Sequence, residues 1–390
     1  MGAQSRPVID VCLVATVPYS LTVFMTPHVK TLSRVYRVTL VANGKAEELS
    51  KLLGGSVSFH KVAIARHISI VEDVKAVISL WKLFRNRRFQ IVHSITPKGG
   101  LLSMIAASVA GVPIRLHWFT GQVWATKSAV SRWLLKSLDR LLVFCSTHVL
   151  ADSHSQRDFL VEEGVLKRAD VVVLGHGSVC GVDTERFRPN PVMGSRIRAA
   201  VGIPDDGVVA LYLGRLNREK GVADLAGAFR IAARARADLH LLIVGPDEAH
   251  VRESVMDTLA EVADRVHFVD YTSEPEAYMA AADMFVLPSR REGFGSTVIE
   301  AAACEIPTIG TSIYGLSDAL VDGESGILVP VGNVGALSSA MVRLATNPHE
   351  RRAMGKAARI RVEQQFKQEH LTAALIDLYQ KLLDSHGGSR

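Results

Sequence analysis

Two carboxylates bracket a short glycine-containing segment in the second half of the chain. The segment is Arg291-Glu-Gly-Phe-Gly-Ser-Thr-Val-Ile-Glu300, and it follows the apolar run 284–288, which is typical of a buried strand. Gly293 and Gly295 remove side chains where a ligand could approach the backbone. The helix expected after them would present free N–H groups and a positive dipole end, which suit an anion.

A second loop with phosphate-binding chemistry follows the apolar run 208–213. It reads Gly214-Arg-Leu-Asn-Arg-Glu-Lys-Gly221, and a helical pattern comes next. Arg215 can offer a planar fork to phosphate oxygens, whereas Lys220 offers a mobile point charge. Charge-assisted bonds of this kind are worth roughly 1.5–3 kcal/mol each. A solvated turn of mixed charges is the alternative for this segment on its own.

Phosphate binding does not explain the two glutamates, because carboxylates repel phosphate. Carboxylates accept hydrogen bonds from hydroxyl groups. Glu300 also has a structural interpretation, since Thr297-Val-Ile-Glu300 matches the Ser/Thr-x-x-Glu capping box of a helix start. Glu292 precedes the glycines and is expected to point into a binding cleft. A ligand that carries both a diphosphate and many hydroxyls is a nucleotide sugar, and this is the ligand that the pattern favours.

Apolar, β-branched runs alternate with helical patterns along the whole chain, which predicts parallel sheets covered on both faces. Arg186-Phe-Arg-Pro-Asn-Pro191 separates two such series. We therefore predict an α/β fold with two doubly wound, Rossmann-like domains, 1–187 and 188–367. The last helical stretch, within 368–390, is expected to pack back on the first domain. Ligands of such folds bind in the cleft at the carboxyl edges of the strands.

Bulk properties narrow the class of protein. The chain has 390 residues, which suits two domains, and its four cysteines form no metal or disulfide pattern, which fits a reducing cytosol. No secretory leader is evident, and the apolar run 101–114 is too short to span a bilayer. Residues 1–187 hold 23 Lys or Arg and 13 Asp or Glu, whereas the remainder is net acidic. A basic half can face nucleic acid, an anionic membrane, phosphorylated substrates or only water.

Together, the Glu-x7-Glu of residues 292–300 and the Gly-Arg…Lys-Gly of residues 214–221 resemble the retaining glycosyltransferases of family 4, which have the two-domain GT-B fold. The closer resemblance is to bacterial enzymes of capsule, O-antigen and glycan-carrier assembly, through 96–100, 117–124 and 151–157. It implies transfer of a hexose or N-acetylhexosamine from a UDP-sugar to a lipid-diphosphate-linked glycan acceptor.

The resemblance also implies residue roles. Arg215 and Lys220 would bind the donor diphosphate and stabilise it as it leaves, Glu300 would bind the ribose, and Glu292 would hold hydroxyls of the donor sugar. His117, expected at the end of a strand in the first domain, would face the same sugar. The backbone of a short segment would contact sugar and phosphate: Phe294, Gly295, Ser296 and Thr297.

The chain contains no Asp-x-Asp triplet of the kind that holds a divalent ion against a diphosphate. Cations and a helix end can supply the positive charge instead. We therefore expect no essential metal and no cofactor beyond the UDP-sugar substrate. No residue declares itself a covalent nucleophile, so displacement on one face of the sugar is favoured.

Two basic and apolar segments suggest where an acceptor membrane would meet the first domain: 81–88 and 132–140. Arg132, Lys136 and Arg140 recur every four positions on one helix face, which can rest on anionic lipid. The alternative places the apolar residues in the core and the cations in water. The resemblance implies a cytoplasmic protein, peripheral on the inner face of the plasma membrane.

Other functions remain possible from the sequence. A nucleotide-sugar 2-epimerase or a pyridoxal-dependent phosphorylase shares the fold class, and a glycosyltransferase could use a soluble acceptor. Nucleic acid is not an expected partner, because the chain has no zinc finger, RNP-type aromatic motif or long basic helix.

Overall fold

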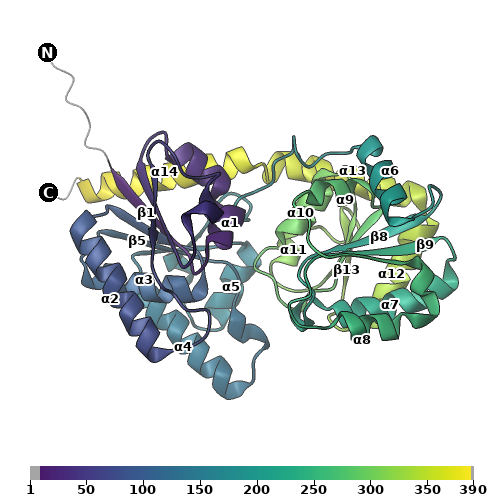
Figure 1. Ribbon diagram of the computed structural model, residues 1–390, viewed down its shortest axis with the longest axis horizontal. Coiled ribbons are helices and arrows are strands. Elements are labelled where there is room, and N and C mark those ends of the chain that lie inside the picture. The colour runs from purple at the N-terminus through teal and green to yellow at the C-terminus, as the bar shows by residue number, and fades with distance from the viewer. Residues whose placement is uncertain (1–8, 388–390) are drawn as a thin grey trace, which may run out of the picture. The chain divides into compact units, whose positions relative to one another are not determined.

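The computed structural model describes residues 9–387, and within them the chain forms two compact units (Figure 1). One unit contains the chain up to Cys180 together with the segment from Gln368 onward, and the other contains Gly181–Lys367. Residues 1–8 and 388–390, which the predicted domain ranges include, lie outside the described residues. Each unit is built on one parallel sheet, so the predicted α/β fold with two Rossmann-like domains is confirmed.

The first unit has a seven-stranded sheet in the order β3-β2-β1-β4-β5-β6-β7. Its strand order reverses direction between β1 and β4, as in doubly wound folds. The strands are β1 (Asp10–Val14), β2 (Arg37–Ala42), β3 (Val57–Lys61), β4 (Ile91–Ser94), β5 (Ile114–Phe119), β6 (His148–Ala151) and β7 (Val171–Val173).

Alternate side chains of β1 divide the core of the first unit into two layers. Val11 and Leu13 pack with α1 and α14, whereas Cys12 and Val14 pack with α2, α3 and α4 on the opposite face. The helices are α1 (Pro18–Leu32), α2 (Ile70–Arg87), α3 (Pro97–Val109), α4 (Ala129–Cys145), α5 (His154–Glu162) and α14 (Gln368–Gly387).

The second unit has a six-stranded sheet in the order β10-β9-β8-β11-β12-β13. The strands are β8 (Val208–Leu213), β9 (Leu239–Val244), β10 (Val266–Val269), β11 (Met284–Leu287), β12 (Thr308–Thr311) and β13 (Gly326–Val329). The helices are α6 (Pro191–Val201), α7 (Val222–Ala235), α8 (Arg252–Thr258), α9 (Pro275–Ala280), α10 (Ser296–Ala303), α11 (Leu316–Ala319), α12 (Val334–Thr346) and α13 (Pro348–Gln365). The strands are almost entirely buried, which explains their continuous apolar sequences.

The boundary between the units follows Cys180 and so lies seven residues before the position expected from the proline-rich segment. Val182 and Phe187 are buried in the core of the second unit, and the Val182 amide donates to the carbonyl of Phe366 at 2.8 Å. The chain therefore joins the second core before it reaches the prolines.

The C-terminal helix α14 is fastened to the first unit by buried polar contacts as well as by apolar packing (Figure 1). His28 of α1 bonds through Nε2 to the carbonyl of Val179 at 2.7 Å and through Nδ1 to the hydroxyl of Thr372 at 3.0 Å. Because a carbonyl only accepts, the proton of the neutral ring lies on Nε2 and Thr372 donates to Nδ1. A second bond joins His93 Nδ1 to the hydroxyl of Tyr379 at 2.7 Å.

None of the helices within residues 9–387 combines the length and the apolar character that a membrane crossing requires.

We predict that His28 makes stability depend on pH. Burial lowers the pKa of its imidazole from 6.5 to about 4, so between these values the unfolded chain binds a proton that the folded protein does not. The free energy of unfolding should therefore fall by about 1.4 kcal/mol per pH unit as the pH drops through this range. Urea unfolding at several pH values should show a shallower slope for His28→Asn.

The same substitution at His60, which is exposed, is the matched control and should leave the slope unchanged. Parallel pH profiles for the wild type and His28→Asn would contradict the assignment.

Candidate nucleotide-sugar site

The two predicted loops meet at the topological switch point of the second sheet. Loop 214–221 follows β8 and loop 288–295 follows β11, and these strands are hydrogen-bonded neighbours at the point where the strand order reverses. Ligands of doubly wound folds bind outside the carboxyl ends of the strands at such a point. The fold thus places both motifs at the position where a ligand is expected.

A half-buried ion pair links the two loops. Lys220 Nζ donates to Glu292 Oε1 at 2.5 Å, and the Ser289 hydroxyl donates to the same oxygen at 2.7 Å. The two ionised side chains are 21% and 12% exposed, so water screens them only in part. Both bonds use Oε1, and no described residue donates to Oε2. Glu292 is therefore oriented by Lys220 and keeps one oxygen able to accept from a hydroxyl.

The backbones of the loops also lie against each other. The Arg290 amide donates to the carbonyl of Glu219 at 2.8 Å, and the Arg291 guanidinium pairs with the Glu219 carboxylate. Gly221 has φ +69°, and a Cβ there would lie 2.0 Å from the Pro288 carbonyl oxygen. This approach and this backbone conformation require glycine.

Helix α10 starts two residues earlier than the capping-box interpretation needs. Its N-cap is Gly295, with φ +81° and no side-chain cap, so Thr297 lies inside the first turn. The Thr297–Glu300 capping box is therefore absent from the structure. Glu300 is left available for another purpose.

Glu300 is half-buried in an environment that the sequence did not reveal. Burial raises the pKa of its carboxyl to about 7, while nearby Arg186 lowers that pKa and Glu276 raises it. Arg186 is itself held by Glu276 Oε2 at 2.7 Å. Near neutral pH, Glu300 can thus either accept or donate hydrogen bonds to hydroxyls. Sequence reasoning missed Arg186 and Glu276, because neither lies in a recognisable motif.

Arg215 lies at the exposed rim of the same loop. Its Nη1 is 2.9 Å from Glu248 Oε2, and its side chain is 54% exposed. The Tyr212 hydroxyl donates to the Arg215 carbonyl at 2.8 Å, which fixes the backbone beneath the guanidinium. An exposed pair of this kind contributes little to stability, so the guanidinium can exchange Glu248 for another anion at low cost.

The residues around the start of α10 divide into core and surface. Phe294 is buried with its ring 5.2 Å from that of Phe366, so only its backbone can meet a ligand. Ser296 and Thr297 are half-buried in the first turn of the helix. Their N–H groups have no partner within the helix and remain suited to an anion.

His117, which the resemblance placed against the donor sugar, is a buried residue of the first sheet. It lies within β5, not at its end, and its side chain is only 1% exposed. Its Nδ1 is 2.8 Å from the Ser94 hydroxyl, and a Cβ at Gly100 of α3 would lie 2.4 Å from its ring. Burial lowers the pKa of the ring to about 3. In the first unit, His117 is a packed strand residue beneath α3, and a contact between its ring and the donor sugar stays a prediction.

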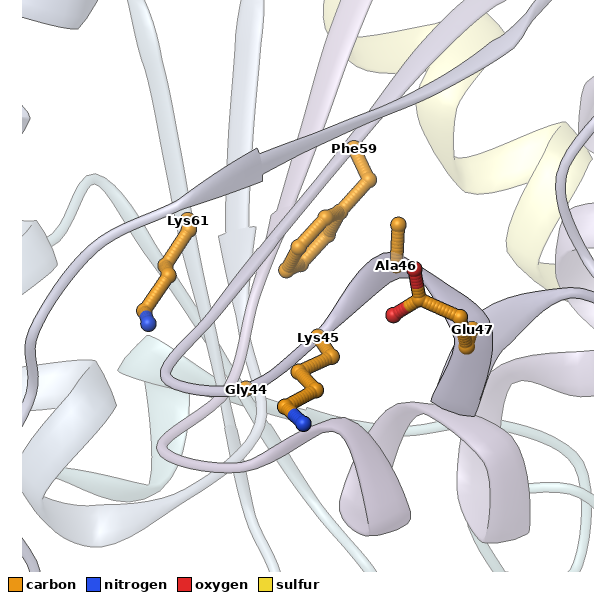
Figure 2. Close-up of a pocket in the computed structure, with 6 residues that line it drawn as sticks. All are labelled: Gly44, Lys45, Ala46, Glu47, Phe59 and Lys61. Carbon is orange, nitrogen blue, oxygen red and sulfur yellow. The ribbon is translucent and has the colours of Figure 1, made fainter.

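The first unit carries a separate hollow of about 620 Å³, lined in part by Lys45, Phe59 and Lys61 (Figure 2). None of the predicted site residues lines it. Among residues 9–387, there is also no group of three or more His, Cys, Asp or Glu side chains placed to hold a metal ion.

Two family models match consecutive parts of the chain: "Glycosyl transferase 4-like domain" over residues 31–177 and "Glycosyl transferases group 1" over residues 195–361. The chain therefore belongs to the family 4-type glycosyltransferases and is a glycosyltransferase of the GT-B fold.

Individual relatives agree with this family. The chain is 29% identical to the capsular polysaccharide biosynthesis glycosyltransferase CapM of Staphylococcus aureus, over 84% of this chain and 86% of CapM. It is 27% identical to the UDP-Gal:alpha-D-GlcNAc-diphosphoundecaprenol alpha-1,3-galactosyltransferase of Escherichia coli, over 85% and 86% of the two chains. The crystal structure of Anabaena HepE in complex with UDP and glucose superposes with a TM-score of 0.81 over 96% of this chain and all of HepE, at 14% identity.

We predict that Gly221→Ala destabilises the second unit more than an equivalent change elsewhere. The left-handed conformation alone costs an alanine roughly 1–2 kcal/mol, and the collision with the Pro288 carbonyl adds to this. Gly202→Ala is the matched control, because Gly202 has φ +77° but open space around its Cβ position. Denaturant unfolding of both variants measures the difference, and equal losses would show that the two loops do not touch as described.

Proposed function

We propose that this protein is a retaining glycosyltransferase of bacterial surface polysaccharide synthesis. It would move a hexose or N-acetylhexosamine from a UDP-sugar to a lipid-diphosphate-linked glycan acceptor. The observation that carries the proposal is the meeting of Arg215, Lys220, Glu292 and the start of α10 at one switch point. The capsular and diphosphoundecaprenol-directed relatives support both the pathway and the class of acceptor.

The proposed binding of the UDP-sugar donor follows from the charges at the site. Breaking the bond between the anomeric carbon and the diphosphate builds positive charge on the sugar and negative charge on the leaving group. Arg215, Lys220 and the N–H groups at the start of α10 are placed to stabilise the diphosphate. Glu292 Oε2 and Glu300 would accept from sugar and ribose hydroxyls, respectively. The UDP complex of HepE supports a uridine nucleotide as the donor carrier.

The proposed retention of configuration by displacement on one face rests on the lack of a suitable nucleophile among the described residues of the site. Glu292 is the carboxylate that we assign to the sugar hydroxyls, and Lys220 and Ser289 hold one of its oxygens. We therefore favour displacement on a single face of the sugar, with the leaving diphosphate accepting the proton of the acceptor hydroxyl. No essential metal takes part in this scheme, because the two cations and the helix start carry the charge.

A nucleotide-sugar 2-epimerase would bind the same donor without needing an acceptor, and a soluble acceptor would remove the need for lipid. Product analysis with and without a lipid-diphosphate-linked glycan separates these cases.

We predict that Lys220→Ala lowers UDP-sugar turnover by about 10²–10³-fold, because a preorganised charge against the leaving group is lost. It also leaves Glu292 without its cationic partner, so the KM for the donor should rise as well. Arg234→Ala is the matched control: Arg234 pairs with Glu261 on the surface at the other end of α7. Steady-state kinetics with each variant test the role, and full activity of Lys220→Ala would refute it.

We predict that the new glycosidic bond keeps the anomeric configuration of the donor and that an excess of EDTA leaves the rate unchanged. Proton NMR of the product at early times measures the first, and initial rates with and without chelator measure the second. Inversion would exclude the proposed displacement. Trapping of a glycosyl ester on Glu292 would replace it with a two-step mechanism, and a rate restored only by added Mg²⁺ or Mn²⁺ would require a metal.

A further inference from the structure

The outer face of α4 is apolar and has no partner among the described residues. Five large apolar side chains lie within an arc of about 100° on this helix, opposite the residues that face the core. They are Val130, Trp133, Leu134, Leu141 and Phe144. Trp133 is 67% exposed and Phe144 is 85% exposed, whereas Leu142 on the inner face is buried. Aromatic side chains grouped in this way on a surface helix mark an interaction surface.

Of the cations of α4, Arg132 and Lys136 are half-buried against the first unit, whereas Arg140 is exposed beside the apolar face. Arg132 and Lys136 pair with Glu163, the latter at 2.7 Å, and both lie over the ring of Trp124. Arg140 Nε donates to the carbonyl of Gly164 at 2.9 Å. These contacts fix the rotation of α4 about its axis, and that rotation turns the apolar side chains outward.

Helix α2 continues the same surface. Both α2 and α4 pack against α3 on one face of the first sheet (Figure 1). The outward residues Ile70, Val74, Ile78 and Trp81 of α2 are exposed, and Ala76, Leu80 and Phe84 face the core. Arg85 lies within the exposed stripe of α2, with Lys75 and Lys82 beside it, and all three are exposed. We call the outward residues of α2 and α4 the α2–α4 surface.

The positive charge around the α2–α4 surface indicates what kind of partner could bind it. Residues 66–144 contain twelve Lys or Arg and three Asp or Glu, so nine of the ten excess positive charges of residues 1–187 lie in this segment. Eight of these cations are exposed, but only one of the three acids, Glu72. A second copy of the chain would bring the same positive charge against itself, which opposes a symmetric dimer through this surface. An anionic bilayer offers the opposite charge and an apolar interior.

We propose that the α2–α4 surface docks on an anionic lipid bilayer, with Trp133 and Phe144 inserted between the headgroups and the cations of α2 facing lipid phosphates. Tryptophan favours the membrane interface, and long basic side chains can extend from an apolar face to the headgroups. Amphipathic helices bind membranes in this orientation. The inference rests on the proposed function for its purpose, since a lipid-linked acceptor lies in a membrane.

The test is co-sedimentation of the full chain with phosphatidylcholine vesicles that contain about 30% phosphatidylglycerol, an anionic lipid. Trp133→Ser combined with Phe144→Ser should weaken vesicle binding about tenfold or more, because two apolar side chains no longer leave water. Val192→Ser combined with Ile360→Ser is the matched control, since these side chains are 84% and 55% exposed on the second unit. The control should bind vesicles as the wild type does.

Intrinsic fluorescence gives an independent readout of insertion. Of the four tryptophans, Trp118 and Trp124 are buried, and Trp81 and Trp133 lie on the α2–α4 surface. Vesicles should therefore shift the emission to shorter wavelength, and the shift should shrink in Trp133→Phe. In about 1 M salt, where the Debye length is about 3 Å, binding should weaken but the shift of the bound fraction should persist.

Three results would overturn the proposal. They are wild-type protein that does not bind the vesicles, a double serine variant that binds as well as the wild type, and a wild-type dimer that the double serine variant dissociates. The failure of the proposed function has a different signature. Binding of UDP and cleavage of UDP-sugar, measured on the same proteins without lipid, should be unchanged by the serine substitutions. Vesicle binding without any UDP-sugar binding would refute the enzymatic proposal and leave the α2–α4 surface intact.

Discussion

The contact between two loops at one edge of the second sheet is the constraint on which the proposed chemistry depends. Lys220 and Glu292 lie on loops 72 residues apart in sequence, and their 2.5 Å bond joins the ends of two neighbouring strands. Removing such a pair from water costs free energy that its attraction offsets only in part. The close backbone approach at Gly221 and the backbone hydrogen bond between Arg290 and Glu219 also hold the loops together. The pair is thus better suited to setting positions than to adding stability.

The same arrangement explains why acids occur in a site for a diphosphate. A cluster of cations alone would attract any anion, and nothing in it would orient a sugar. Lys220 and Ser289 bind one oxygen of Glu292, and in the proposed function its other oxygen would accept from hydroxyl groups. Glu300 is held in a half-buried environment where its protonation is balanced near neutral pH. In the proposed function, the two glutamates would therefore add hydroxyl recognition on either side of a positively charged centre.

Much of the fold and the outline of the donor site could be predicted from the sequence, because their signals are local. Continuous apolar strands and glycine-containing loops at strand ends give the sheets, the switch point and the two motif loops. Strand β13 was missed, since it directly follows the turn-like segment 321–325. The position of the unit boundary depended on the burial of Val182, which no local pattern shows.

Side-chain direction was harder to predict, because it depends on packing between distant segments. His117 was expected at a strand end, but the register of β5 with β4 places it opposite Ser94 and beneath Gly100. The capping box at Thr297 failed because Gly295 already provides the left-handed residue before α10. Two of the three periodic cations of α4 are held against the first unit, because Arg132 and Lys136 pair with Glu163, the residue after α5, and lie over Trp124, which precedes α4.

The inward direction of those cations bears on how the first unit could meet a charged surface. Had Arg132 and Lys136 faced outward, α4 would offer charge that salt screens readily. With both cations bound to Glu163, the helix offers an apolar face whose attraction to a bilayer is not screened by salt, and the exposed cations of α2, together with Arg140 of α4, supply the charge. The two properties thus lie mainly on different helices of the same face of the sheet. The charge of α2 would attract the protein to an anionic surface, and the apolar face of α4 would then bind there. A single helix with mixed faces would couple these two properties, whereas here they can be changed separately by substitution.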